Sequence, residues 1–340
     1  METLAIILML CGAVAQAGHV SAQRYLIGGK KILSKYEPLV IQYAFRTVAL
    51  LAIMPFWSDF GTMALSSNRI FWIGVAGVIG ANLWIQYANV HARSKPTVDV
   101  SFTEPIQSLT PFLVTLAAIS FGEHPSIQGW AGIALISFGN LLHLREGMSP
   151  LSREYWQPFV QFMLPRNFEF LGKVQQEELL ERRSAILWSY GSACVGAVGL
   201  IFDATLVRHG SVALGFALQG VFLGGWFFFL SRRSNEKRAS LADRVRAHIV
   251  PVLILCIAWT LMVLFTNTAF RLAPVGYIGT LKRLYLPILL IFSVLFLGEK
   301  KAKLRIMPNS LITVGAVFLA FDGSFAKLVD RFEDFLDFLM

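Results

Sequence analysis

Charged residues are scarce in this 340-residue chain: only 15% are Asp, Glu, Lys or Arg, whereas 55% are hydrophobic and 13% aromatic. Soluble domains carry about 25% charged residues. With a mean hydropathy of +0.59, the chain has too few charges to cover a water-facing surface. The composition therefore excludes an ordinary soluble domain and predicts an integral membrane protein.

Cysteine is also rare, and its three positions, Cys11, Cys194 and Cys256, all fall in apolar segments without CxxC spacing or matching histidines. This excludes a disulfide framework and a Cys/His metal centre. The chain has no HExxH, Walker or GxSxG motif, so it carries none of these enzyme signatures. We predict that the protein is not an enzyme and uses no metal or cofactor.

Apolar segments long enough to cross a ~30 Å hydrocarbon core as helices occur ten times and predict an all-α membrane protein. The predicted spans are 3–23, 38–57, 70–91, 98–121, 127–144, 185–207, 211–231, 248–270, 275–297 and 306–326. They form two five-span halves, 1–145 and 185–326. A linker at 146–184 is predicted to be cytoplasmic, and an amphipathic tail at 327–340 is predicted to lie on the membrane surface.

The net charge of +9 comes from Lys and Arg residues in short gaps between spans, not from a basic patch, so nucleic acid is not a predicted partner. The basic gaps alternate with neutral ones, and the phase reverses between halves. The gap after span one carries Arg24, Lys30, Lys31 and Lys35, but its counterpart after span six carries only Arg208. Because basic loops stay cytoplasmic, the halves are predicted to cross the membrane in opposite directions. Both termini are then non-cytoplasmic, a topology that fits a bacterial inner membrane.

An internal repeat leads to the same conclusion. Phe121-Gly122-Glu123 aligns with Leu297-Gly298-Glu299, which also superimposes Pro111 on Pro287. A second offset, with one gap, aligns the region from Cys11 to Arg24 with the region from Cys194 to Arg208. Since each repeat has an odd number of spans, the second copy must be inverted.

The run from Ser108 to Phe112, followed by Phe121–Glu123 and Gly129–Ile136, resembles the fourth and fifth helices of the drug/metabolite transporter superfamily, EamA type. Arg46 lies where such proteins often have an aromatic-arginine pair. The resemblance covers nearly the whole chain except the linker and the tail. It implies a ten-helix bundle whose third, fourth, eighth and ninth helices surround a central cavity that opens alternately to each side.

Six ionisable residues lie inside predicted spans, where each costs at least ~2.5 kcal/mol unless it is paired or hydrated. They are His19, Arg46, Glu104, Asp203, Lys282 and Arg283. The adjacent cations Lys282 and Arg283 are predicted to hold an anionic substrate group, Arg as a fork and Lys as a point charge. A fixed salt bridge to Glu104 or Asp203 is the alternative. The pair also resembles the phosphate-gripping pair of the triose-phosphate translocators.

The remaining candidates have open alternatives. Glu104, His19 and Asp203 are candidates for proton coupling, with permanent pairing across helices as the alternative. Arg46 is predicted to tie span two to neighbouring carbonyls. Polar and aromatic residues of the central spans are predicted to line the substrate site or to form an interfacial aromatic belt. They are Trp84, Tyr87, Gln107, Tyr277 and Tyr285.

These observations predict a secondary transporter for a small polar, anionic solute, such as a phosphorylated or carboxylate metabolite or a phosphate-linked lipid head-group. Membrane lipids and coupling protons are the other expected partners. An amino-acid or amine exporter is the alternative within transport. A non-transporting scaffold or lipid-phosphate transferase is the alternative from another class, and it would need a general base among Glu104, His19 and Asp203.

Overall fold

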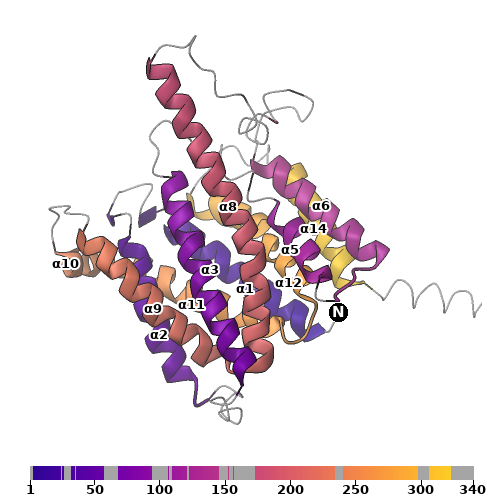
Figure 1. Ribbon diagram of the computed structural model, residues 1–340, viewed down its shortest axis with the longest axis horizontal. Helices are drawn as coiled ribbons and strands as arrows, with labels where there is room; N and C mark the ends of the chain where they lie inside the picture. The colour runs from indigo at the N-terminus through magenta and orange to yellow at the C-terminus, as the bar shows by residue number, and fades with distance from the viewer. Residues whose placement is uncertain are drawn as a thin grey trace, which may run out of the picture.

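The computed structural model describes residues 3–23, 25–26, 32–34, 36–56, 68–93, 106, 109–120, 122–144, 152, 156, 173–233, 240–297 and 306–322. The described residues form helices and connecting turns, with no strand among them. The elements are α1 (Thr3–Gln23), α2 (Glu37–Ile53), α3 (Arg69–Arg93), α5 (Thr110–Ile119), α6 (Ile127–Leu144), α8 (Lys173–His209), α9 (Val212–Arg233), α10 (Leu241–Ala247), α11 (Ile249–Ala269), α12 (Val275–Leu281), the 3₁₀ turn η5 (Lys282–Leu284), α13 (Tyr285–Leu297) and α14 (Ile306–Ala320). Figure 1 shows their arrangement.

Six helical segments of the described chain are long and apolar enough to cross a membrane, by length and composition. They are Thr3–Gln23, Arg69–Asn89, Leu179–His209, Val212–Arg233, Ile249–Ala269 and Val275–Phe292. Three further apolar helices are shorter: Thr110–Ile119, Ile127–Leu142 and Ile306–Ala320. The predicted all-helical, membrane-type architecture is thus confirmed at this level.

Large apolar side chains cover the outward faces of these helices. Val48 of α2 is 70% exposed and Phe222 of α9 is 59% exposed. Such a continuous apolar surface is unfavourable in water and suits contact with lipid acyl chains.

The structure differs from the predicted segment boundaries in two places. Helix α8 begins at Lys173, inside the predicted linker 146–184, because no Gly or Pro interrupts residues 173–190. Its 37 residues span about 55 Å, and its first turns extend beyond the neighbouring helices in Figure 1. Helix α10 lies within the predicted basic loop after span seven. The tail 327–340 and residues 98–105, 107–108 and 121 of the predicted span 98–121 lie outside the described residues.

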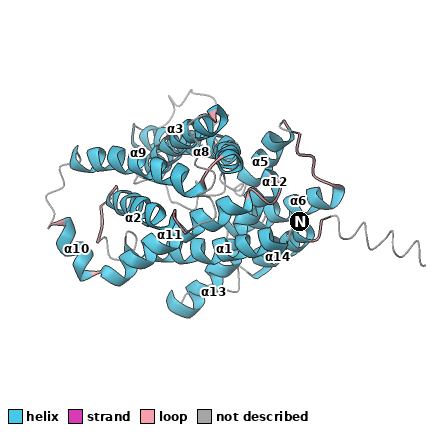
Figure 2. Ribbon diagram, turned by 90° about the horizontal axis from the view of Figure 1, so that it is seen from below, coloured by secondary structure: helices cyan, strands magenta, loops and turns pink. Residues whose placement is uncertain are grey.

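The helices pack in pairs that join the two halves of the sequence. Helix α1 packs along α11, α3 along α8, α2 along α9 and α6 along α14; Figure 2 shows the same helices from below. Because lipid removes most of the hydrophobic drive between helices, small residues that permit close backbone approach become important. At the α6–α14 crossing, a Cβ added to Gly132 would lie 2.8 Å from the carbonyl oxygen of Gly315.

The predicted span 275–297 is broken in its middle. α12 ends at Leu281, Lys282–Leu284 form the 3₁₀ turn η5, and α13 follows. Pro287 explains the break, because it cannot donate to the carbonyl of Arg283 four residues earlier and its ring crowds that carbonyl. The break therefore coincides with the two cations that the sequence singled out.

Candidate functional site

A cluster of buried polar side chains lies between α2, α8, α9 and η5. Its most buried member is Arg46 of α2, which is 1% exposed. The Nη2 atom of Arg46 donates to the carbonyl oxygen of Phe216 at 3.2 Å and to Gln219 Oε1 at 2.7 Å. The guanidinium also lies 4.8 Å from the centre of the Tyr43 ring. The prediction that Arg46 ties its helix to a neighbouring carbonyl is confirmed.

Asp203 of α8 supplies the carboxylate of this cluster and is 8% exposed. Its charge interacts with those of Lys282 and Arg46. Its Oδ1 atom is buried and has no hydrogen-bond partner among the described residues. A buried carboxylate oxygen without a donor is costly, so Asp203 is placed to accept a proton or a donor that the described residues do not provide.

Lys282 reaches the cluster from η5 and is half-buried. Its Nζ atom lies 5.4 Å from the centre of the Phe270 ring, within the range of a cation–π contact. Lys282 interacts favourably with Asp203 and unfavourably with the adjacent Arg283. Among the described residues, two cations, Arg46 and Lys282, thus interact with one carboxylate, an excess of one positive charge.

Arg283 and Tyr285 are also half-buried. Successive residues of a 3₁₀ turn point about 120° apart, so Lys282 and Arg283 do not project in the same direction from the backbone. Arg46 of α2 is a second cation whose charge interacts with Asp203, while the joint grip of Lys282 and Arg283 on one group stays a prediction.

His19 and Asp203 have different neighbours, although the repeat alignment puts them at nearly equivalent positions. His19 of α1 is buried, and its Nδ1 atom lies 3.2 Å from the carbonyl oxygen of Leu255. Its ring centre is 4.7 Å from that of Trp259, also on α11. Since a carbonyl only accepts, Nδ1 is the donor, and the histidine is held against α11 rather than turned toward Asp203.

Trp84 and Tyr87 belong to an aromatic group formed by α3 and α8. Trp84 is 44% exposed, and its ring centre lies 5.4 Å from that of Trp188. Tyr87 lies 3.9 Å from His91 and 5.6 Å from Trp188, measured between ring centres. The exposure of Trp84 agrees with the interfacial alternative for this residue, whereas Tyr87 is half-buried beneath it.

Tyr277 lies at the start of α12, where its hydroxyl donates to Asp322 and accepts a hydrogen bond from the backbone N–H of Ser126 at 3.3 Å. Its polar atom is thus engaged at one end of the bundle. Glu104 and Gln107 lie outside the described residues. Within the described part of the chain, no group of three or more His, Cys, Asp or Glu side chains is arranged to hold a metal ion.

An ion pair between Glu37 and Arg244 links the start of α2 to α10. Arg244 donates to both oxygens of Glu37, at 2.7 and 2.5 Å, and to the carbonyl oxygen of Ile32 at 2.9 Å. Burial alone would raise the pKa of Glu37. The hydrogen bonds from Arg244 and from the backbone N–H of Ser34 outweigh burial and hold that pKa below its ordinary value.

Gln219 and Phe270 were missed by sequence reasoning. Gln219 could have been found, because it is the one amide in the apolar stretch 212–230. Phe270 gives no sequence signal, since it is one of 28 phenylalanines and its role depends on what its ring and carbonyl contact.

No family model and no curated protein matches the chain. Solved structures do match it. One of them, described only as the crystal structure of a protein, is 14% identical with a TM-score of 0.67 and covers 94% of this chain and 96% of its own. At that identity the likeness concerns the fold alone, and it extends over nearly the full length of both chains.

Proposed function

We propose that the protein is a secondary transporter of a small anionic solute, working by alternating access in a ten-span bundle of the drug/metabolite transporter type. The observation that carries the proposal is the charge cluster of Arg46, Lys282 and Asp203, in which the described residues supply two cations and one carboxylate. Charges at membrane depth are costly and mark solute or ion pathways. An anion entering beside Lys282 would neutralise the excess.

The pairing of the helices supports the inverted repeat. Under the predicted correspondence, α1, α2, α3, α5 and α6 match α8, α9, α11, α12–α13 and α14. If each helix is replaced by its counterpart in the other half, the α1–α11 pair becomes α8–α3 and the α1–α13 pair becomes α8–α5. All four of these pairs are in contact. The pairs α2–α9, α5–α12 and α6–α14 map onto themselves. A pseudo-two-fold axis gives this result, and an arbitrary bundle does not.

The broken helix at Lys282 supports the proposed site. Discontinuous helices carry solute sites in many secondary transporters, because their ends leave backbone groups unpaired beside the ligand. In this chain the break at η5 brings Lys282 to the cluster, while Arg46 is already fixed by Phe216 and Gln219. Lys282 is therefore the cation that can leave Asp203 and bind an incoming anion, such as a phosphate or carboxylate.

Asp203 is the favoured proton acceptor of the described residues. Its Oδ1 atom has no donor among them, and removing Lys282 to a substrate anion would leave only Arg46 to stabilise the carboxylate. Protonation of Asp203 would then accompany anion binding. Glu104 remains a predicted proton-coupling group, because it is an ionisable residue inside a predicted span.

One observation favours a zwitterionic solute as the second candidate. The unpaired Oδ1 of Asp203 could accept an ammonium while Lys282 binds a carboxylate, so an amino acid would satisfy both groups. This version of the amine-exporter alternative assigns to Asp203 the role that the sequence gave to Glu104.

The test is a thermal-shift and flux comparison on purified protein. Inorganic phosphate and organic phosphates should raise the melting temperature, because a ligand of the native state stabilises it, and a labelled form should enter proteoliposomes chemically unchanged. Amino acids acting in their place would favour the zwitterion, and chemical conversion of the solute would indicate the transferase alternative.

We predict that Lys282→Ala abolishes both the shift and the flux, and that Arg283→Ala lowers flux. Arg246→Ala, which removes an exposed cation of α10, is the matched control and should retain both. Parent-level uptake in Lys282→Ala would remove this lysine from the site.

The proposed setting is a cell membrane with the basic gaps on the cytoplasmic side and both termini outside, since short basic loops resist translocation. The end of the bundle near Arg208 is then the non-cytoplasmic one, and the end near Arg244 is cytoplasmic.

A further inference from the structure

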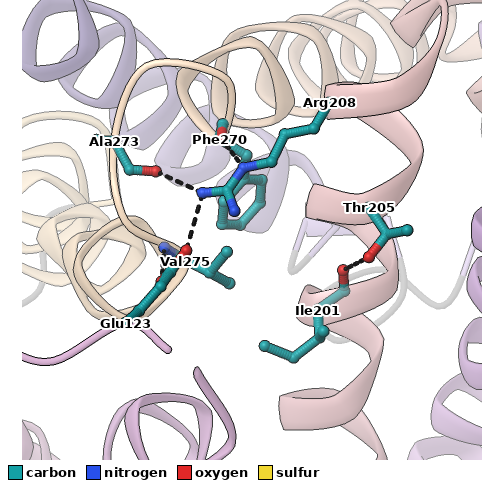
Figure 3. A network of polar contacts seen from close by, with 7 residues as sticks. All are labelled: Glu123, Ile201, Thr205, Arg208, Phe270, Ala273 and Val275. Carbon is teal, nitrogen blue, oxygen red and sulfur yellow. Dashed lines mark hydrogen bonds and ion pairs between the residues drawn. The ribbon is translucent and has the colours of Figure 1, made fainter. Parts of the chain in front are cut away.

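A network of polar contacts ties several elements together where α8 ends (Figure 3). Arg208 donates from Nη2 to Glu123 Oε1 at 2.9 Å. It also donates from Nε to the carbonyl oxygen of Phe270 at 3.0 Å and from Nη2 to that of Ala273 at 3.2 Å. Arg208 thus joins the end of α8 to the loop before α6 and to the turn between α11 and α12.

Glu123 binds α12 with its second carboxylate oxygen. Oε2 accepts a hydrogen bond from the backbone N–H of Val275, the first residue of α12, at 2.6 Å. A carboxylate suits a helix start, where backbone N–H groups lack intrahelical acceptors. Glu123, from the first half of the chain, therefore holds α8 and α12 of the second half at once.

The ion pair between Arg208 and Glu123 lies partly exposed to water, where it can open. The Arg208 and Glu123 side chains are 37% and 20% exposed, so water competes for the ion pair, unlike a fully buried one. Gly122, just before Glu123, has a positive φ of 84° and open space around its Cβ position. A residue without a side chain at this point lets the loop that carries Glu123 change direction at little cost.

Phe270 connects this network to the charge cluster. Its carbonyl oxygen accepts from Arg208, while its ring lies 5.4 Å from Lys282 Nζ. α8 carries Arg208 and also Asp203, whose charge interacts with Lys282. α8 and the α12–η5 segment are therefore linked twice, once at the bundle end through Glu123 and once at the cluster through Lys282.

We propose that Arg208 and Glu123 form a latch that keeps this end of the bundle closed, and that occupancy of the Lys282 site weakens the latch through Phe270. This inference rests on the proposed function, because it takes an anion at Lys282 as the signal. When the anion draws Lys282 away from Asp203 and Phe270, α12 loses its inner link to α8. The ion pair between Glu123 and Arg208, which water can reach, then opens.

The latch is tested with a single-cysteine reporter in protein whose three native cysteines are replaced by alanine. Thr115→Cys on α5 is suitable, since Thr115 is fully buried and faces Gly276 of α12, the residue after Val275, which binds Glu123. Its rate of modification by a charged thiol reagent is measured in lipid nanodiscs, where both ends of the bundle are accessible.

Glu123→Gln should raise the modification rate roughly fivefold, as expected for losing one partly exposed ion pair. Arg208→Gln should do the same. Glu37→Gln breaks the pair with Arg244 at the opposite end and is the matched control that leaves the rate unchanged. Folding of each variant is checked by its melting temperature and monodispersity. Parent-level rates in both folded latch variants would overturn the latch.

Phe270→Leu tests the coupling, because it removes the ring contact with Lys282 and keeps the backbone carbonyl that binds Arg208. Inorganic phosphate should speed modification in the parent and have no effect in Phe270→Leu. An equal phosphate response in both proteins would overturn the coupling. If phosphate causes no thermal shift at all, the proposed anion site and the coupling both fail, while the Glu123→Gln result still decides whether the latch exists.

Discussion

The α6–α14 crossing gives the sharpest quantitative prediction. A Cβ added to Gly132 would lie 2.8 Å from the carbonyl oxygen of Gly315, and one added to Gly315 would lie 2.7 Å from that of Gly132. Ordinary contacts begin near 3.4 Å. Both obstacles are backbone atoms, which cannot rotate away as a side chain can. Gly132→Ala therefore requires the two helices to separate by roughly 0.6 Å.

The expected cost follows from that separation. Overpacking of this kind costs about 1–3 kcal/mol, partly offset by the ~1 kcal/mol that alanine gains over glycine in a helix. Gly80→Ala of α3 isolates the second effect, because nothing lies within 4 Å of its Cβ position. The two variants should thus differ by about 2 kcal/mol, or roughly 3 °C in melting temperature for a chain of this length.

The assay is the melting temperature of each purified variant in the same detergent. The double variant Gly132→Ala/Gly315→Ala should cost less than the sum of the single ones, since one displacement of α14 relieves both contacts. If Gly132→Ala melts at the same temperature as Gly80→Ala, the close backbone approach at this crossing is refuted.

Three further predictions follow from named contacts. Arg46→Met leaves Gln219 and Asp203 without their shared cation and should lower the free energy of unfolding by about 3 kcal/mol. Gln219→Leu should lower it by about 1 kcal/mol. Equal melting temperatures for the two variants would contradict this ranking. Because the folded-state pKa of Glu37 is lowered, the stability that it contributes is present above the unfolded pKa of about 4.3 and is lost as pH falls through the folded pKa. The difference in stability between the parent and Glu37→Gln should therefore shrink as pH falls over that range. A constant difference would argue against the Arg244 contact. Tyr277→Phe removes the hydrogen bonds to Asp322 and Ser126 and should lower the free energy of unfolding by about 1 kcal/mol, while phosphate still raises the melting temperature. Loss of that phosphate response would indicate that Tyr277 lines the solute site.

Several helices were predicted from the sequence to within a few residues. The ranges 3–23, 70–91, 127–144, 211–231 and 248–270 correspond to α1, α3, α6, α9 and α11. This agreement has a local cause, because an apolar run of sufficient length must form a helix in lipid to satisfy its own backbone groups. The apolar pattern placed the start of the sixth span at 185, because the first turns of α8, residues 173–184, are largely polar and lack that signal.

The candidate site was predicted only in part. Lys282, Asp203 and Arg46 stand out in the sequence because ionisable groups are rare in apolar segments. The sequence favoured Lys282 with Arg283, which stays a prediction, and it did not place Arg46 of α2 near Asp203, whose charge interacts with that of Arg46. Which cation partners Lys282 depends on the geometry of the break and on the neighbouring helix, and adjacency in sequence indicates neither.

Composition and spacing by themselves determined that this chain is helical and suited to a membrane, because hydrophobic length and backbone hydrogen bonding act within each segment. Only the tertiary structure decided that the carbonyl of Phe270 meets Arg208 while its ring meets Lys282, and that Glu123 reaches α12. Those contacts join residues far apart in the chain, and they exist only at the angles and separations at which the helices cross.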